Sequence, residues 1–277
     1  MLVPENATLE QIESARARLG LDKPLPVQYG IFIRDVLHGN FGKSYIYGKP
    51  AMDLIFERMP ATLELVAVAA CLVLCIAIPL GVYAGAYPKR ASSKLIMSGS
   101  ILGISLPSFW VGMMMIYIFA VVLRLLPASG RGNTVMVGNV ALSIFAPGGI
   151  RYVILPAITL ALTNVATMLR LTRSGILENM RQDYIKFARA KGVPAKSILF
   201  GHALKNALIP VVTIFGMDLG NMIAFTTITE TIFAWPGMGK LLIDAINKSD
   251  RPIIVAYLMA AACMFVVLNF IVDILYT

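Results

Sequence analysis

Few residues in this 277-residue sequence have the types and spacing that catalysis or metal binding requires. The only histidines are His38 and His202, and no His-Glu-x-x-His pattern brings metal ligands together. Cys71 and Cys75 would share one face of a helix, but no further ligand accompanies them in the sequence. We therefore expect no metal site and no catalytic residues, and we expect the cysteines to act as small apolar side chains.

One glycine-rich stretch is similar to the end of a phosphate-binding loop. Residues 237–241 read Gly-Met-Gly-Lys-Leu, whereas the full pattern is G-x-x-x-x-G-K followed by Ser or Thr. Ala234 stands where the first glycine is required, and Leu241 replaces the hydroxyl residue. We therefore expect this chain to bind no cofactor and to hydrolyse no ATP itself.

Polar residues inside apolar stretches indicate a different chemistry, the passage of a polar solute. Asp218 is the acid nearest the middle of such a stretch, and Asn221 lies one helical turn away. Its carboxylate could meet a cationic group such as a peptide amine, or it could pair with a neighbouring helix. Thr159, Thr163 and Thr167 recur every four residues and form one polar stripe. This stripe predicts either a lining of the solute path or hydrogen bonds between helices.

Pro107 interrupts another apolar stretch between Ser105 and Ser108. Because proline has no N–H, it frees the carbonyl group of Gly103 and predicts a kinked helix. Broken helices are tolerated in membranes where protein or a wet cavity satisfies the freed groups. Ser105 and Ser108 are therefore candidates for the solute path, and a purely structural kink is the alternative.

Membrane-spanning helices must position these residues. The sequence is 58% apolar and 14% charged, against about 25% charged for a soluble domain. Five apolar segments, of which the third is the shortest, are long enough for an α-helix to cross a hydrocarbon layer of roughly 30 Å. The segments cover about 61–86, 95–123, 152–169, 207–229 and 253–276. We predict an all-α polytopic membrane helix bundle.

The basic residues predict the orientation of this bundle. Loop 170–205 holds eight Lys or Arg and two acidic residues, so it carries +6 of the net charge of +9. The short loop 88–94 adds three basic residues and no acid. The positive-inside bias makes both loops cytoplasmic and places loops 124–151 and 232–252 outside. Loop 124–151 opposes the bias, because it carries three arginines and no acid. The concentration of charge in one loop between apolar segments argues against a nucleic-acid partner.

With this orientation, residues 1–60 form an extracytoplasmic region, and residues 61–277 form the transmembrane domain with cytoplasmic loop 170–205. The first region is balanced at seven basic and seven acidic residues, and residues 10–19 predict a short helix stopped by Gly20. Nothing within it could carry it across a membrane. We therefore expect a further span to precede it, and the last apolar segment continues to the end of the sequence.

The basic loop contains the most specific local pattern. Asp183 suits an N-cap, residues 184–191 can form about two helical turns, and Gly192 fits the left-handed position after a helix. Pro194 suits the start of the next helix, 195–206, which continues into the fourth apolar segment. Such a short helix at a sharp bend could fit a groove of a partner. An ordinary basic loop beside anionic lipid headgroups is the alternative.

Residues 184–192 and 202–210 resemble the EAA motif loop of binding-protein-dependent ABC importer permeases, specifically the dipeptide, oligopeptide and nickel branch. They read Tyr-Ile-Lys-Phe-Ala-Arg-Ala-Lys-Gly and His-Ala-Leu-Lys-Asn-Ala-Leu-Ile-Pro. Ala188, Gly192 and Leu204 match the general pattern E-A-A-x₃-G-x₉-I-x-L-P. The departures from it are Lys186, Phe187, His202 and Lys205 at the Glu, Ala, Ile and Pro positions. Stretches 17–29, 60–65, 106–110, 230–239 and 269–273 also resemble that branch.

This resemblance implies a type I ABC importer permease in the bacterial inner membrane, with five of its spans visible here. The implied partners are a homologous second permease subunit, two cytoplasmic ATPase subunits that bind ATP and Mg²⁺, and an extracytoplasmic substrate-binding protein. The short helix at 184–191 would be a coupling helix seated in an ATPase cleft. The residues assigned to coupling are Tyr184, Phe187, Ala188, Arg189, Ala190, Lys191, Gly192, His202 and Asn206. Closure of the ATPases would tilt the bundle between inward-open and outward-open states.

An ion-coupled secondary transporter or a channel is the alternative function. That class predicts several ionisable residues at mid-membrane, and Asp218 is the main one in this sequence. Dipeptides, longer peptides, nickel and metal chelates are all candidate cargoes of the importer. The separate binding protein is expected to select among them.

Overall fold

The computed structural model describes residues 10, 13 and 22–276. The helix predicted at 10–19 lies outside the described residues, except for residues 10 and 13. The helices are α2 (Leu25–Leu37), α3 (Ala51–Ala86), α4 (Ala91–Ser105), α5 (Ser108–Met115), α6 (Ile150–Asn179), α7 (Asp183–Ala190), α8 (Ala195–Ser197), α9 (Leu204–Ile232), α10 (Met238–Asn247) and α11 (Arg251–Tyr276), with π-helical segments η1 (Ile116–Val122) and η2 (Ile198–Ala203). Strands β1 (Val135–Val137) and β2 (Val140–Leu142) form an antiparallel hairpin.

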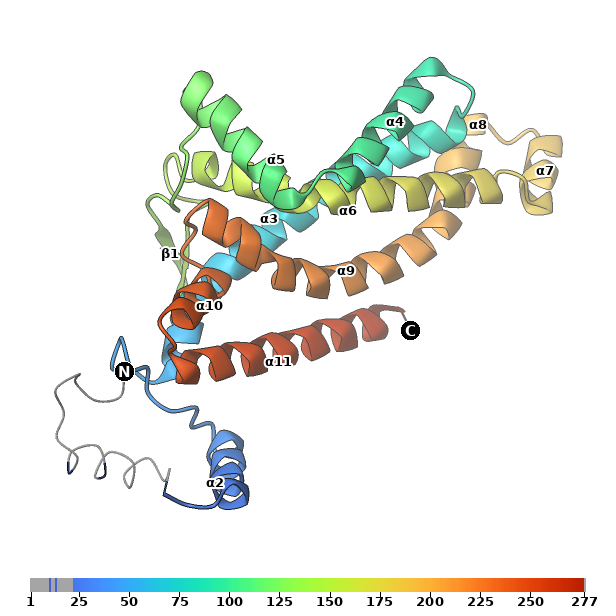
Figure 1. Ribbon diagram of the computed structural model, residues 1–277. Helices are drawn as coiled ribbons and strands as arrows, with labels where there is room; N and C mark the ends of the chain where they lie inside the picture. The colour runs from blue at the N-terminus through green and yellow to red at the C-terminus, as the bar shows by residue number, and fades with distance from the viewer. Residues whose placement is uncertain (1–9, 11–12, 14–21, 277) are drawn as a thin grey trace.

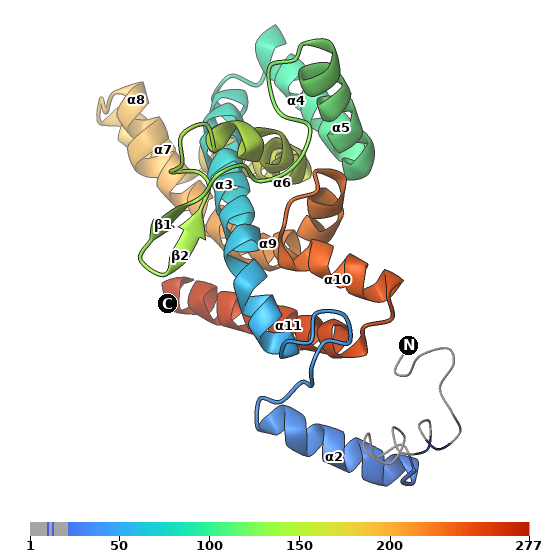
Figure 2. The same cartoon turned by 90° about the vertical axis from the view of Figure 1, so that its left-hand side faces the viewer.

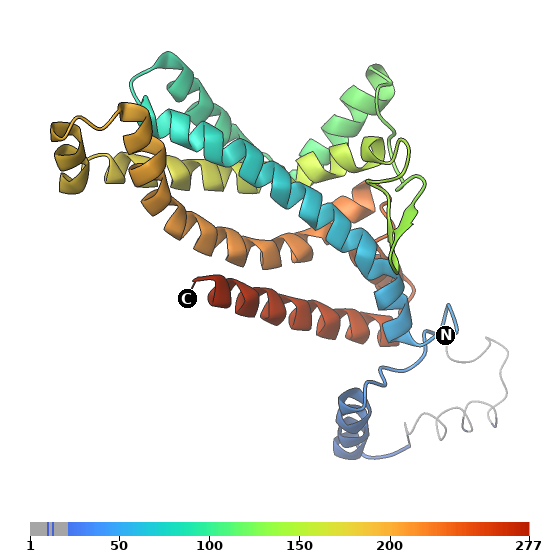
Figure 3. The same ribbon diagram turned by 180° about the vertical axis from the view of Figure 1, so that it is seen from behind.

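Four helical stretches in the described part are long and apolar enough to cross a membrane: α3, α6, the continuous stretch Ala195–Ile232, and α11. Helices α4 and α5 pass the same test together but are bent by 104° at their junction, so the count is five if this bent pair is one span. Figures 1 and 3 show α4 beginning near the end of α3 and α5 ending near the hairpin, so the pair crosses the bundle. The predicted all-α membrane bundle is confirmed, and the kink at Pro107 is a sharp break.

Helix α3 begins at Ala51, before the apolar segment that was expected to start at 61. Its first turns are amphipathic: Leu54 and Ile55 are buried against α10 and α11, while Asp53 and Glu57 are exposed. The predicted boundary between 60 and 61 therefore lies inside one helix. The difference arises because apolar composition marks the part of a helix that lies in hydrocarbon, whereas packing on neighbours extends the helix beyond it.

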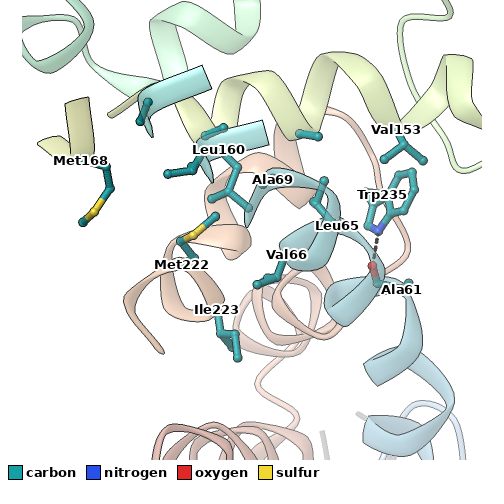
Figure 4. Packing of buried hydrophobic residues seen from close by; sticks show 14 of the residues in the cluster. Ala61, Leu65, Val66, Ala69, Val153, Leu160, Met168, Met222, Ile223 and Trp235 are labelled. Carbon is teal, nitrogen blue, oxygen red and sulfur yellow. Dashed lines mark hydrogen bonds between the residues drawn. The ribbon is translucent and has the colours of Figure 1, made fainter. Parts of the chain in front are cut away.

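The core lies where α3, α6 and α9 pack together. Leu65 and Ala69 from α3, Leu160 from α6 and Met222 from α9 are buried in one cluster with Trp235 (Figure 4). Small residues allow the close approach of these helices. A Cβ atom at Gly81 would lie 2.6 Å from the Thr172 Cβ on α6, and one at Gly85 would lie 2.7 Å from the Ile176 Cβ.

The two ends of the bundle carry different elements. Helices α7 and α8 lie at one end, and the β1–β2 hairpin and α10 lie at the other (Figure 1). We refer to them as the α7 end and the hairpin end. Helix α2 lies apart from the bundle beside the hairpin end (Figure 2), and none of its residues is buried. The positive-inside bias places the α7 end in the cytoplasm.

Candidate functional site

Helix α7 is attached to the bundle by one apolar face. Ile185 and Ala188, which are three residues apart, are both buried. They belong to a cluster with Val82 of α3, Ile176 of α6 and Ala207 of α9. Because residues three apart lie on the same side of a helix, these two side chains share one face of α7 and the remaining ones point away. One face of α7 is therefore buried in a cluster to which three spans contribute residues.

The opposite face of α7 is exposed and combines an aromatic ring with charged groups. Phe187 is 63% exposed, and the Lys191 Nζ lies 4.5 Å from the centroid of its ring. Arg189 and Ala190 are also exposed, and the Lys186 Nζ lies 2.8 Å from the Asp183 Oδ1. An exposed aromatic residue surrounded by polar groups is typical of a residue that anchors a protein–protein contact.

Gly192 ends α7 as the sequence predicts. Its φ is +77°, and its N–H donates to the Arg189 carbonyl at 3.0 Å. The Val193 N–H donates to the Ala188 carbonyl at 3.2 Å, which completes the two-bond Schellman arrangement. The N-cap prediction is wrong by one residue: Gln182 is the N-cap, and Asp183 is the first residue of the helix. The Asp183 carboxylate pairs with Lys186 instead of capping the backbone.

Tyr184 connects α7 to the two helices that flank it. Its hydroxyl donates to the Asn179 Oδ1 at 2.8 Å, and it accepts from the Asn206 Nδ2 at 3.0 Å. Asn179 is the last residue of α6, and Asn206 lies in the first turn of α9. His202 is exposed in the π-helical segment η2 that precedes α9. The structure thus gathers every residue assigned to coupling at the α7 end.

The threonine stripe is divided between the interior and the surface. Thr159 is buried, and its side chain packs where Gly112 of α5 crosses α6. Thr163 is exposed, and Thr167 is half-buried. The hydroxyls of Thr159 and Thr167 both donate to the carbonyl four residues earlier on their own helix. Only the part of the stripe around Thr163 is therefore open at the surface of this chain.

The other path candidates lie on two separate elements. Ser105 and Ser108 flank the 104° break between α4 and α5. The Ser105 hydroxyl donates to the Ile101 carbonyl at 2.9 Å. Asp218 is half-buried on α9, and Asn221 is exposed. Among the described residues, no hydrogen bond joins these groups to the threonine stripe, so each remains a separate candidate.

At the hairpin end, sequence reasoning missed a buried ion pair. The Glu64 carboxylate on α3 accepts from the Arg131 Nε at 2.9 Å and the Nη2 at 2.5 Å. It also accepts from the Ser143 N–H and hydroxyl at 2.6 and 2.9 Å and from the Ile144 N–H at 2.7 Å. The side chains of Glu64 and Arg131 are 2% and 11% exposed. This cluster holds loop 124–149 and its hairpin on α3.

A second buried carboxylate joins α9, α10 and α3. Glu230 is fully buried; it accepts from the Thr62 hydroxyl at 2.6 Å and from the Lys240 N–H at 2.9 Å. The Trp235 indole N–H donates to the Ala61 carbonyl at 2.9 Å. At the start of α10, the Met238 N–H donates to the Thr62 hydroxyl and the Lys240 N–H donates to Glu230. A phosphate-binding loop would offer such N–H groups to a ligand, whereas here they have partners within the chain. The signal for this cluster in the sequence was Glu230 itself, an acid near the end of an apolar segment.

Potential metal ligands are dispersed in the structure. Within residues 22–276, no group of three or more His, Cys, Asp or Glu side chains gathers to hold a metal ion. Cys71, Cys75 and Cys263 are free and exposed.

Residues 77–277 match the family model described as binding-protein-dependent transport system inner membrane component. The probable D,D-dipeptide transport system permease protein DdpB of Escherichia coli is 36% identical over 100% of this chain and 85% of its own length. The oligopeptide transport system permease protein AppB of Bacillus subtilis is 40% identical over 94% of this chain and 80% of its own length. Among solved structures, an inward-facing MetNI methionine ABC transporter chain matches with a TM-score of 0.62 and 16% identity, covering 81% of this chain and 95% of that chain.

Proposed function

The chain belongs to the family of binding-protein-dependent transport system inner membrane components, and we propose that it is the membrane-spanning permease subunit of an ATP-driven peptide importer. It is a multi-pass inner-membrane protein and a transport subunit. The relatives named above are permeases of D,D-dipeptide and oligopeptide transport. Their names favour peptides over nickel or metal chelates as the cargo of this chain.

The attachment of α7 is the observation that carries this proposal. Ile185 and Ala188 are buried in a cluster with residues of α3, α6 and α9, and Tyr184 is hydrogen-bonded to α6 and α9, while Phe187 and the neighbouring charges face away from the bundle. This geometry suits a coupling helix whose exposed face fits a cleft of a cytoplasmic ATPase subunit. Two such ATPases, a second permease subunit and an extracytoplasmic binding protein would complete the importer. ATP is hydrolysed on the ATPases, and this chain converts their closure into a rigid-body tilt.

The hairpin end supports a rigid-body movement. Glu64 and Arg131 fix loop 124–149, which leads into α6, to α3, and Thr62 and Glu230 fix α9 to α3. At the opposite end, the same three helices contribute residues to the cluster that buries one face of α7. A force applied to α7 therefore tilts α3, α6 and α9 together, since neither end allows one of them to slide alone.

The substrate path lies on the faces that this three-helix unit leaves open. We assign Thr163, Asp218 and the serines at the α4–α5 break to this path, with the Asp218 carboxylate receiving the amino group of a peptide. The variant Asp218→Asn removes the negative charge and keeps the side-chain size. If this variant transports peptide at the normal rate, Asp218 does not contribute to the substrate path.

Gly192 offers the sharpest test of coupling. A β-branched residue at φ +77° costs more than the roughly 1–2 kcal/mol of an ordinary left-handed residue, so Gly192→Val reorients the end of α7. We expect the reconstituted importer to assemble and hydrolyse ATP but to lose peptide uptake. Gly201→Ala is the matched control, because Gly201 lies in the same loop at an ordinary φ with only the Ser197 Oγ within 4 Å.

Two results would contradict the proposal. Normal uptake by Gly192→Val in a normally assembled complex would exclude coupling through α7. Peptide or ion uptake by the purified chain alone, driven by an ion gradient without any ATPase, would support a secondary transporter instead.

A further inference from the structure

A cavity with basic side chains in its lining and an apolar groove meet at the hairpin end of the bundle. The cavity has a volume of about 660 Å³ and lies between α2, residues 40–45 and the start of α11. The groove has a volume of about 470 Å³ and lies between α3 and α11. Phe41 lines both of them, so they adjoin one another. None of the proposed coupling or path residues lines either space.

The cavity is basic. Lys23, Arg34 and Arg251 line it together with a single acid, Asp35. Asp35 lies 3.4 Å from the Arg34 guanidinium, in an exposed pair. Within residues 22–276, neither Lys23 nor Arg251 has an acidic partner at salt-bridge distance. Gln28, Asn40 and Tyr45 add polar side chains to the lining. The cavity is therefore complementary in charge to an anionic group.

Buried hydrogen bonds fix one wall of this cavity. The Asp250 carboxylate, which is fully buried, accepts from the Ser44 hydroxyl at 2.5 Å. It also accepts from the Tyr45 and Ile46 N–H groups at 3.3 and 3.4 Å. These bonds hold the segment that carries Phe41 and Tyr45 against the first turn of α11. The wall formed by residues 40–45 and the start of α11 is thus held in place by the fold.

One face of α11 leads from the cavity into the groove. Pro252 and Val255 line the cavity, and Met259, Cys263 and Val267 line the groove at successive spacings of four residues. These positions share one side of a helix and extend over about 22 Å at 1.5 Å per residue. On the α3 side, Met52, Phe56, Met59 and Leu63 complete an apolar lining. A ligand that fills both spaces must have an anionic head and a long apolar tail.

Helix α2 has the character of a helix that lies on a membrane surface. It has no buried residue. Its large apolar side chains are therefore open to the surroundings: Leu25 and Leu37 are 79% and 80% exposed, and Tyr29 is also exposed. A short apolar helix next to basic side chains suits the headgroup level of a bilayer. Residues of α2 line the cavity together with Arg251 and Pro252 at the start of α11, at the hairpin end of the bundle.

We propose that the cavity and the groove together bind one phospholipid of the extracytoplasmic leaflet. Its phosphate lies beside Lys23 and Arg251, and one acyl chain follows α11 along Met259 and Cys263. Basic pockets between membrane helices are typical binding sites of anionic lipid headgroups. A protein helix would fill the groove but would leave the basic cavity without an anion. The lipid fixes α2 to α11 and so completes the hairpin end of the bundle.

Photolabelling of the full chain, in the complex with which it purifies, tests this site. The complex is placed in nanodiscs of phosphatidylethanolamine with a trace of phosphatidylglycerol that carries a diazirine on its acyl chain. We expect labelling of residues 259–267 to exceed labelling of residues 76–80 on α3, whose Ile76 and Leu80 are similarly exposed. A diacylglycerol probe, which has no phosphate, should lack this preference, and added inorganic phosphate should leave it unchanged.

Charge variants separate a bound lipid from general contact with the bilayer. Arg251→Gln and Lys23→Gln should each lower labelling of 259–267 about fivefold, in line with one basic residue near a lipid headgroup. Lys248→Gln is the control, because Lys248 is exposed near the same turn but does not line the cavity. Using two variants on different elements guards against a local folding defect in either one.

Three outcomes would overturn the proposal: equal labelling of both segments, equal labelling by the diacylglycerol probe, or unchanged labelling in both charge variants. Crosslinks from Cys263 to another protein subunit in the purified complex would also overturn it, since protein would then occupy the groove.

Discussion

Replacing Tyr184 with phenylalanine removes the hydroxyl that connects α7 to both α6 and α9. Two hydrogen bonds are lost, at 2.8 Å to Asn179 and 3.0 Å from Asn206. Each contributes about 0.5–1.5 kcal/mol, and the lower value applies because Tyr184 is exposed. The loss of about 1 kcal/mol corresponds to roughly a fivefold change in the equilibrium between attached and detached α7. We expect peptide uptake per ATP hydrolysed to fall by at most this factor, with the unfolding temperature lowered by at most about 2–4 °C.

The measurement is uptake and ATP hydrolysis in the same proteoliposomes. Asn206→Ala breaks only one of the two hydrogen bonds and should give the smaller loss. The double variant should be no worse than Tyr184→Phe alone, because that change already removes both bonds. Tyr47→Phe is the control, since Tyr47 is exposed and lies in the segment before α3. Wild-type uptake per ATP in Tyr184→Phe, or additive losses in the double variant, would refute transmission through this hydroxyl.

Two further predictions concern the stability of the bundle. Gly81→Ala places a methyl group against an α6 side chain and backbone carbonyl at 2.6 and 2.8 Å, so it should lower the unfolding free energy by about 1–3 kcal/mol. Gly99→Ala, where nothing lies within 4 Å, should be neutral, and an equal loss in both would contradict the packing. Glu64→Gln leaves the buried Arg131 without its counter-charge and should cost about 3 kcal/mol in detergent unfolding, the lower end of the range for a broken buried pair. Glu57→Gln, which breaks an exposed pair, should cost less than about 1 kcal/mol, so a similar effect of both would refute the role of burial.

The α7 end could be predicted from the sequence because its signals are local. A glycine at φ +77° and a proline two residues later define the end of one short helix and the start of the next within a few residues of chain. The break at Pro107 was predictable for the same reason. Its angle of 104° was not, because the angle depends on how α4 and α5 each pack against α6.

The partners of the buried acids could not be predicted, because they lie far apart in the sequence. Glu64 and Arg131 are separated by 67 residues, and Thr62 and Glu230 by 168. In the sequence, Glu64 and Glu230 are visible only as acids near the ends of apolar segments. The structure also explains part of the conflict between loop 124–151 and the positive-inside bias, because Glu64 neutralises Arg131, one of the three arginines of that loop.

The break between α4 and α5 has an electrical consequence. Among the described residues, the carbonyl groups of 103–106 and the N–H groups of 108–110 have no backbone partner across the break. Each such group would cost several kcal/mol in hydrocarbon, so the break is stable only where water or protein satisfies these groups. Where water is the partner, the insulating layer beside this subunit is thinner, and the transmembrane voltage falls mainly across the part that stays dry. A charged solute that moves between the break and the far side of the dry part would therefore cross most of the transmembrane voltage in that one step.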